Sequence, residues 1–203
     1  DRWATIKRIE FEAGKFPIPP KVVSSMDDNQ KLSLLVAKQA LAFEGLKSVA
    51  NDRVAVIMGN SMIGQLHHDY VARFNCDKFE YYLKQQNVFV ERLSPQEQEQ
   101  LLSGVRKKIV GNAPCVTEDT APGVLPNIIA ARINSVFDLH GHAYVVDAAC
   151  ASGLAAIICG IQQLRLHEVD AVICGAVDMQ NREVGRIYFS GIGALSAEGS
   201  FPF

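Results

Sequence analysis

The residue whose type and setting most favour chemistry is Cys150, which lies in the small-residue stretch 147–153. An apolar run at 143–146 precedes it and apolar residues at helical spacing follow it, so the pattern predicts a strand, a sharp turn and a helix. The first N–H groups of a helix lack internal acceptors and the helix dipole places partial positive charge there; both stabilise a thiolate. The same N–H groups can stabilise an oxyanion on a thioester carbonyl. The local residues thus favour a nucleophile and a buried structural cysteine about equally.

The neighbours of Cys150 suit a crowded turn below a substrate tunnel, because five of them are small: Ala148, Ala149, Ala151, Ser152 and Gly153. Asp147, three residues before the cysteine, is expected to hold the turn by side-chain-to-backbone hydrogen bonds and not to transfer protons. His142 is close in sequence but lies across the predicted strand, so it is not assigned as the base. Arg132 is expected to make a structural ion pair or to bind loop carbonyls.

Two other patterns suggest ligands and are set aside. Residues 59–64 have the glycine spacing of a phosphate loop, but Gln65 and Leu66 stand where a P-loop needs lysine and then serine or threonine. A strand-end loop lining a substrate cavity is the favoured interpretation. The histidines in 67–69 and 140–142 lack the i, i+4 pairing of a zincin motif and are interpreted as surface or loop residues. We therefore expect no metal and no directly bound cofactor.

Composition excludes several classes of protein. The formal net charge is −2, which gives no reason to expect a nucleic-acid or anionic-membrane surface. No apolar run is long enough to cross a bilayer, and the first residues lack signal-peptide features. The number of cysteines, five, is odd and no pair has C-x-x-C spacing, which disfavours a disulfide framework and a cysteine zinc site, so a reducing cytoplasm is expected. Cys159 and Cys174 lie on apolar runs and are predicted to be core residues.

The first half of the chain is predicted to form helices around one buried strand. Asp27 or Asp28 can cap a helix that ends at Gly45. Its buried face is predicted to be Leu32, Leu35, Val36, Ala40 and Phe43. Residues 53–58 predict a buried strand, and 60–90 are expected to be irregular with some helix. Ser94-Pro95-Gln96-Glu97 is a capping box that opens a helix with a buried stripe of Leu101, Leu102, Val105 and Ile109.

The second half alternates helix and strand. A helix carrying Ile128, Ile129, Ile133 and Val136 precedes the strand 143–146. After the cysteine turn, one face of the next helix is formed by Leu154, Ile157, Ile158, Ile161 and Leu164. Residues 170–175 predict another buried strand. Alternation of this kind predicts an α/β fold with a mixed or parallel sheet layered with helices.

The stretch 147–156, Asp-Ala-Ala-Cys-Ala-Ser-Gly-Leu-Ala-Ala, resembles the active-site cysteine motif of β-ketoacyl synthases. Residues 126–133 are similar to the family's N-x-x-A-x-R-I helix, and 138–141 to its D-L-x-G turn. Residues 169–177 resemble the strand that usually ends in Gly-Gly-Val, with Ala176 in place of a common glycine. The loop 195–199 and then Pro202-Phe203 resemble the segment that follows.

Two further segments indicate which subgroup of ketosynthases the chain resembles. Residues 10–21 with 30–34, and the loop 117–123 with its Glu-Asp-Thr-x-Pro-Gly pattern, resemble ketosynthases of iterative polyunsaturated fatty acid synthases and enediyne polyketide synthases. The resemblance implies a thiolase-like α/β fold, N-terminal half, with 1–203 as an incomplete β-ketoacyl synthase N-terminal region. It places the family's first strand before residue 1 and the C-terminal half, with its two catalytic histidines, after Phe203.

By resemblance, Cys150 accepts an acyl chain from the phosphopantetheine arm of an acyl carrier protein. A malonyl extender is then decarboxylated, and its carbanion attacks the Cys150 thioester. The Cys150 N–H forms one side of the oxyanion hole. The expected partners are an acyl carrier protein, a second copy in a homodimer and the other domains of a multidomain synthase, with no nucleic acid and no membrane. Without the second half, this stretch is expected to accept the acyl group but not to condense it.

Two alternatives remain open. The first is a thiolase-fold acyltransferase that does not elongate chains. The second is a non-catalytic partner that shapes a chain-length cavity or scaffolds a complex. Such partners usually lack the cysteine, so Cys150 counts against the second alternative.

Overall fold

The computed structural model describes residues 9–179 and 183–199, and its centre is a three-stranded parallel sheet. The strands are β1 (Val54–Gly59), β2 (Ala143–Val146) and β3 (Ala171–Ala176), in the order β2-β1-β3. The unbroken apolar run of β1 fits its central place, where every residue is buried. The predicted α/β class and all three predicted strands are confirmed, but β3 was predicted to be buried and only its Ile173 is. The sheet was expected to be mixed or parallel, and every strand pair among the described residues is parallel.

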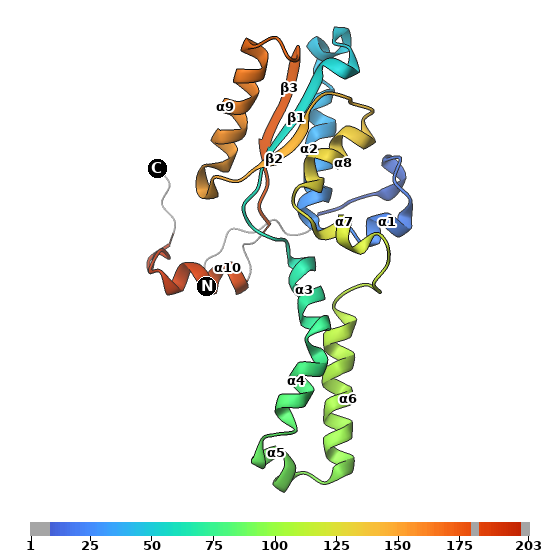
Figure 1. Cartoon of the computed structure of the whole chain (residues 1–203), viewed down its shortest axis with the longest axis vertical. Helices are drawn as coiled ribbons and strands as arrows, with labels where there is room; N and C mark the ends of the chain where they lie inside the picture. The colour runs from blue at the N-terminus through green and yellow to red at the C-terminus, as the bar shows by residue number, and fades with distance from the viewer. Residues whose placement is uncertain (1–8, 180–182, 200–203) are drawn as a thin grey trace.

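Helices cover both faces of this sheet (Figure 1). On one face lies α9 (Ser152–Arg165), which packs on β1 and β3; on the other lie α8 (Ile128–Val136) and, against it, α2 (Asp28–Leu41). The core between β1, α2 and α8 holds fully buried side chains, among them Leu34, Val56 and Ile133. Layers of this kind place the carboxyl ends of all three strands at one edge of the sheet.

Asp27 caps α2, as predicted, because its side chain accepts a hydrogen bond from the Asn29 N–H at 2.9 Å. The predicted end of this helix was wrong, and its predicted buried face was right only in part, because Leu32 and Leu35 are partly buried against the core. The helix ends at Leu41, and Val36 and Phe43 are exposed. The buried face instead carries Asn29, Gln30, Ser33, Leu34 and Ala37. Three of these five side chains are polar, so hydrophobic spacing could not reveal this face.

The segment 65–111 forms a helical arm that extends away from the sheet (Figure 1). It comprises α3 (Gln65–Phe74), α4 (Cys76–Leu83), α5 (Asn87–Arg92) and α6 (Pro95–Gly111). The Ser94–Glu97 capping box is confirmed in both directions. The prediction that 60–90 is largely irregular was wrong, and of the predicted α6 stripe only Leu102 is buried. A two-layer arm buries little of each helix, so its apolar periodicity is weak.

Shorter elements connect these parts. They are the 3-10 helices η1 (Ala13–Lys15), η2 (Glu44–Ser48), η3 (Asn51–Arg53) and η4 (Ala149–Ala151), and the helices α1 (Pro20–Ser24), α7 (Thr120–Val124) and α10 (Glu183–Gly191). Within the described ranges no helix is long and apolar enough to cross a membrane. Pro202 and Phe203, which the family resemblance included, lie outside the described residues.

The apolar face predicted for α9 exists but points away from the sheet. Its residues are exposed: Leu154 (67%), Ile157 (46%), Ile158 (55%), Ile161 (43%) and Leu164 (39%). The face against the sheet carries small or polar residues instead: Ser152, Ala156, Gly160 and Gln163. At Gly160 a Cβ atom would lie 2.5 Å from the Cys174 Sγ, so α9 packs closely on β3 here and a larger residue would require Cys174 to shift.

Candidate functional site

Cys150 lies at the carboxyl edge of the sheet, inside η4, between the end of β2 and the start of α9. Its thiol is free and exposed. The preceding residue, Ala149, has φ of +49°, a left-handed conformation that is unfavourable for a residue with a Cβ. The chain therefore reverses sharply before the cysteine, as predicted, and this strained turn gives it the geometry of a nucleophile elbow.

Two side chains hold the elbow. Asp147 Oδ1 accepts a hydrogen bond from the Ala149 N–H at 2.9 Å, which confirms the turn-holding role predicted for it. Ser152 Oγ accepts from the Ala148 N–H at 2.9 Å and donates to the Ala149 carbonyl at 2.6 Å. Sequence reasoning counted Ser152 only as a small neighbour. A serine in the first turn of a helix is the signal that could have revealed these bonds.

One N–H group of the elbow is left open. The Ala148 N–H donates to the Ser152 side chain and the Ala149 N–H to the Asp147 side chain. The Ala151 N–H donates to the Ala148 carbonyl, and the Ser152 N–H donates to the Ala149 carbonyl. Among the described residues the Cys150 N–H has no acceptor. A free N–H beside an exposed thiol suits an oxyanion that forms when the thiol attacks a carbonyl.

Close packing fixes the elbow against β1. A Cβ atom on Gly59, the last residue of β1, would lie 2.6 Å from the carbonyl of Ser152 and 2.8 Å from the N–H nitrogen of Gly153. A Cβ on Gly153 would meet the Ala176 Cβ of β3 at 3.1 Å. The first turn of α9 is therefore seated directly on the ends of two strands.

The glycine loop 59–64 leads into a helix whose N-terminus, unlike the elbow, has its N–H group bound by a distant side chain. The N-terminus of α3 is occupied by a carboxylate of the chain itself, because Asp27 Oδ2 accepts from the Leu66 N–H at 3.1 Å. Burial raises the pKa of Asp27, against the lowering effect of the Asn29 and Leu66 N–H groups. At Gly64 a Cβ would lie 2.0 Å from the carboxylate oxygens. This helix end already holds an anion, which agrees with the rejection of a phosphate loop.

Arg132 differs from its predicted role. It donates from Nε to the Gln30 side-chain oxygen at 2.8 Å, where an ion pair or loop carbonyls had been expected. Gln30 in turn donates to the carbonyls of Pro122 and Leu125. The reason is that the buried amide of Gln30 stands between the guanidinium and the loop and satisfies both. Burial lowers the pKa of Arg132, with the Asp119 charge acting in the opposite direction.

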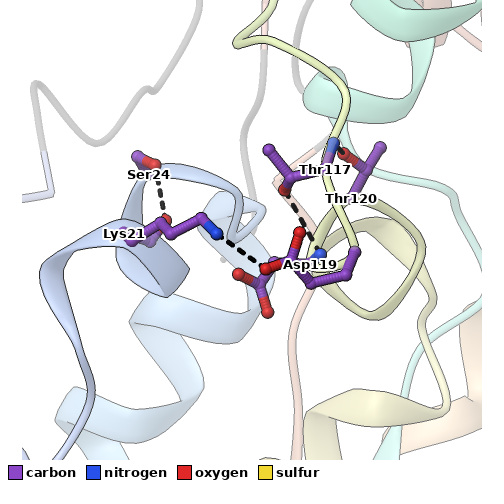
Figure 2. Close-up of polar contacts among 6 residues, drawn as sticks. Lys21, Ser24, Thr117, Asp119 and Thr120 are labelled. Carbon is purple, nitrogen blue, oxygen red and sulfur yellow. Dashed lines mark hydrogen bonds and ion pairs between the residues drawn. The ribbon is translucent and has the colours of Figure 1, made fainter.

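The two segments that narrowed the family resemblance meet in space (Figure 2). Lys21 Nζ, in the segment 10–21, lies 2.6 Å from Glu118 Oε1, in the loop 117–123. The loop is ordered internally, because Thr120 Oγ1 accepts from the Thr117 N–H and Thr117 Oγ1 accepts from the Asp119 N–H. At Gly123 a Cβ would lie 1.7 Å from the Ser25 carbonyl oxygen, so the loop is closely packed on the segment before α2.

The other candidate site residues do not contact Cys150. His142 precedes β2 and Cys150 follows it, so a strand separates them; His142 Nδ1 lies 4.0 Å from Glu168. His140 pairs with Asp138 at 2.9 Å. Cys159 and Cys174 were predicted to be core residues but are only partly buried. Among residues 9–179 and 183–199 no group of three His, Cys, Asp or Glu residues is arranged to bind a metal.

The family model and the relatives that match this chain agree with one another. A family model described as the N-terminal domain of β-ketoacyl synthase matches residues 2–202. The chain is 29% identical over 182 residues to a subunit of the polyunsaturated fatty acid synthase from Thraustochytrium sp., covering 89% of this chain and 6% of that protein. It is 30% identical over 191 residues to a subunit of the phenolphthiocerol/phthiocerol polyketide synthase from Mycobacterium tuberculosis, covering 93% of this chain and 10% of that protein.

The fold is similar to that of a solved ketosynthase, from module 6 of the bacillaene synthase of Bacillus subtilis 168. The TM-score is 0.58 at 20% identity, over 93% of this chain and 25% of the other. This similarity confirms the predicted thiolase-like α/β fold. The chain spans only about a quarter of that ketosynthase and a tenth or less of the two curated relatives.

Proposed function

Because this chain belongs to the β-ketoacyl synthase family, we propose that Cys150 is the residue that accepts the acyl group in its ketosynthase reaction. The observation that carries the proposal is the elbow, in which an exposed thiol stands beside the one N–H of residues 148–152 that lacks an acceptor. The relatives named for polyunsaturated fatty acid and polyketide synthesis support acyl thioesters as the substrate class.

The first step is a thiol exchange. The Cys150 Sγ attacks the carbonyl carbon of an acyl thioester carried on the phosphopantetheine arm of an acyl carrier protein. A carbon–sulfur bond to Cys150 forms, and the negative charge on the carbonyl oxygen is received by the Cys150 N–H. The carbon–sulfur bond to the carrier then breaks. The pantetheine thiol leaves with the proton that Cys150 lost, and the acyl group stays on the enzyme.

The second step is condensation with a malonyl extender on the carrier protein. Loss of carbon dioxide leaves a carbanion on the carrier-bound extender, and this carbanion forms a carbon–carbon bond to the acyl carbonyl carbon. The carbon–sulfur bond to Cys150 then breaks, Cys150 leaves as a thiolate, and the β-ketoacyl product stays on the carrier protein. The elbow supports the acyl-accepting side of this step. His140 pairs with Asp138 at 2.9 Å, and His142, at the opposite end of β2 from Cys150, has its Nδ1 4.0 Å from Glu168. We therefore propose that the proton-handling groups of the condensation come from outside this chain.

The same proposal extends to partners. An acyl carrier protein is the expected donor, and the further domains of a multidomain synthase and a second copy of the chain are the expected neighbours. The outward apolar face of α9 supports protein neighbours, because soluble proteins seldom leave so continuous an apolar surface in water.

The test is acylation in the complete native protein. An acyl-N-acetylcysteamine thioester is added, and peptide mass spectrometry is expected to find the acyl group on Cys150. Cys150→Ala should abolish both acylation and chain elongation, by at least roughly a thousandfold, since the elbow has no other thiol and the Ser152 hydroxyl is held by two hydrogen bonds to the backbone. Cys115→Ala is the matched control, because Cys115 is also a free and exposed cysteine but lies on another loop. Elongation by Cys150→Ala at the wild-type rate would disprove the proposal. Acylation of Cys150 without elongation would favour a non-elongating acyltransferase.

A further inference from the structure

The side chain of Ser152 controls a peptide group that contains the open N–H of Cys150. Its hydroxyl donates to the Ala149 carbonyl at 2.6 Å. That carbonyl and the Cys150 N–H belong to the same peptide unit. Because a peptide unit is planar and trans, fixing the direction of the oxygen fixes the direction of the N–H on the opposite side. The Ser152 hydroxyl therefore acts together with the Ser152 N–H, which bonds the same carbonyl, to set where the Cys150 N–H points.

The serine also holds the conformation that precedes the cysteine. Its oxygen accepts from the Ala148 N–H at 2.9 Å while donating to the Ala149 carbonyl, so it connects the groups on both sides of Ala149. The left-handed φ of Ala149 costs on the order of 1 kcal/mol and persists only where surrounding contacts impose it. Ser152 is 5% exposed, so water does not replace these bonds readily.

The bond to the carbonyl has a second effect on the same peptide. A donor at the carbonyl oxygen polarises the unit and makes its N–H a stronger donor. Asp147 lacks this connection, because its carboxylate accepts from the Ala149 N–H and touches no carbonyl. Of the two side chains that hold the elbow, only Ser152 acts on the peptide that faces the substrate.

We propose that Ser152 is a positioning residue, whose hydroxyl aims and polarises the Cys150 N–H toward the oxyanion that forms on the acyl thioester. The inference rests on the proposed function. It assigns Ser152 no contact with the substrate.

Two reactions of the same thiol separate this role from general support of the fold. Acyl transfer from a thioester passes through an oxyanion and needs the N–H. Alkylation by iodoacetamide is a displacement at carbon that forms no oxyanion. Both rates are measured at Cys150 in the complete native protein, and their ratio is compared between variants. Ser152→Ala should lower the acylation rate roughly tenfold to a hundredfold, which is no more than the effect of removing one oxyanion donor completely. The alkylation rate should change less than about twofold.

Controls isolate the hydroxyl. Ser33→Ala removes another buried serine hydroxyl, which donates to the Asn29 carbonyl at 2.8 Å on α2, and should leave the ratio unchanged. Ser152→Thr keeps the hydroxyl and should retain most of the wild-type ratio. Circular dichroism checks each fold, and Ser152→Gly is the second truncation if the alanine variant does not fold.

The outcomes separate the two claims. Equal losses of acylation and alkylation in the truncated variants, or no loss in either, would overturn the role of Ser152 while Cys150 acylation in the wild type still stands. A ratio that falls as far in Ser152→Thr as in Ser152→Ala would also overturn it. Absence of acyl-Cys150 in the wild type would instead reject the proposed function itself.

Discussion

Two strand-to-helix turns stand side by side at the carboxyl edge of the sheet, and they end in opposite ways. The loop 59–64 leads from β1 to α3, and the elbow 147–151 leads from β2 to α9; Gly59 and Val146, where the strands end, are paired. In the first turn the helix N-terminus is closed by the buried carboxylate of Asp27. In the second, one N–H stays open beside a thiol. Both turns contain a carboxylate, but Asp27 accepts from the Leu66 N–H of α3, whereas Asp147 accepts from the Ala149 N–H and leaves the Cys150 N–H available to a ligand.

The closed turn is expected to depend most on its carboxylate. Asp27→Ala leaves the N–H groups of Asn29 and Leu66 without an acceptor in a buried setting and should cost about 3 kcal/mol of unfolding free energy. Urea denaturation measures it. Asp28→Ala removes the adjacent, more exposed carboxylate and should cost under about 1 kcal/mol. Equal losses in both variants would show that Asp27 does not close the turn.

The contact between the two turns is tested at Gly59. Gly59→Ala places a Cβ against the backbone of Ser152 and Gly153 and should cost about 2 kcal/mol. Because the first turn of α9 must shift, acylation of Cys150 should also slow. Gly104→Ala, on α6 with no atom within 4 Å of its Cβ position, is the matched control and should stabilise the protein slightly. Unchanged Cys150 reactivity in Gly59→Ala would mean that the turns are independent.

The raised pKa of Asp27 gives the unfolding free energy a predictable dependence on pH. Burial raises the pKa of Asp27 above its ordinary value of 3.8, so the folded state holds this proton more tightly than the unfolded state. Stability contributed by the protonated carboxyl is full below a pH of 3.8 and is lost as the pH rises through the folded pKa. The unfolding free energy of the wild type relative to Asp27→Asn should therefore fall across that interval and level off above it. A difference that rises with pH would contradict the assigned direction.

The smallest effect is expected at the strained residue of the open turn. Ala149→Gly removes the cost of a left-handed alanine but adds entropy to the unfolded chain, so the two effects nearly cancel, within about 1 kcal/mol. Thermal unfolding measures the change. A loss above about 2 kcal/mol would show that the Ala149 methyl group packs in a way that outweighs its backbone strain.

The contrast between the turns also shows what the sequence could predict. The strand, the turn and the role of Asp147 followed from local patterns, because each depends on neighbours in the chain. The cap on α3 could not be found in this way, since Asp27 and Leu66 are 39 residues apart. Ser152 was visible but looked like one small residue among several.

Burial was predicted well only where it followed hydrophobicity. The strand β1 is apolar and wholly buried. On α2, however, Gln30 and Asn29 are buried because their amides bind the Pro122 carbonyl and the Met179 N–H, partners that lie far away in sequence. On α9 the apolar face points outward and the small residues face the sheet, since strands and helix approach closely at Gly160. Periodicity finds an apolar face but does not say which neighbour covers it.

The arm has a consequence for how the sheet assembles. Arg53 and Asp170, which pair where β1 and β3 begin, are 117 residues apart in sequence. The arm accounts for a large share of the chain between β1 and β2 but adds no strand. Loop-closure entropy rises only by about 0.6 kcal/mol for each doubling of length, so the inserted arm costs little stability. Folding rate is more sensitive, because parallel pairing of distant strands raises the contact order of the nucleus. The helices of the arm should therefore form before the sheet on which Cys150 depends, because a contact of the arm such as Arg73–Pro114 spans 41 residues and the Arg53–Asp170 pair spans 117.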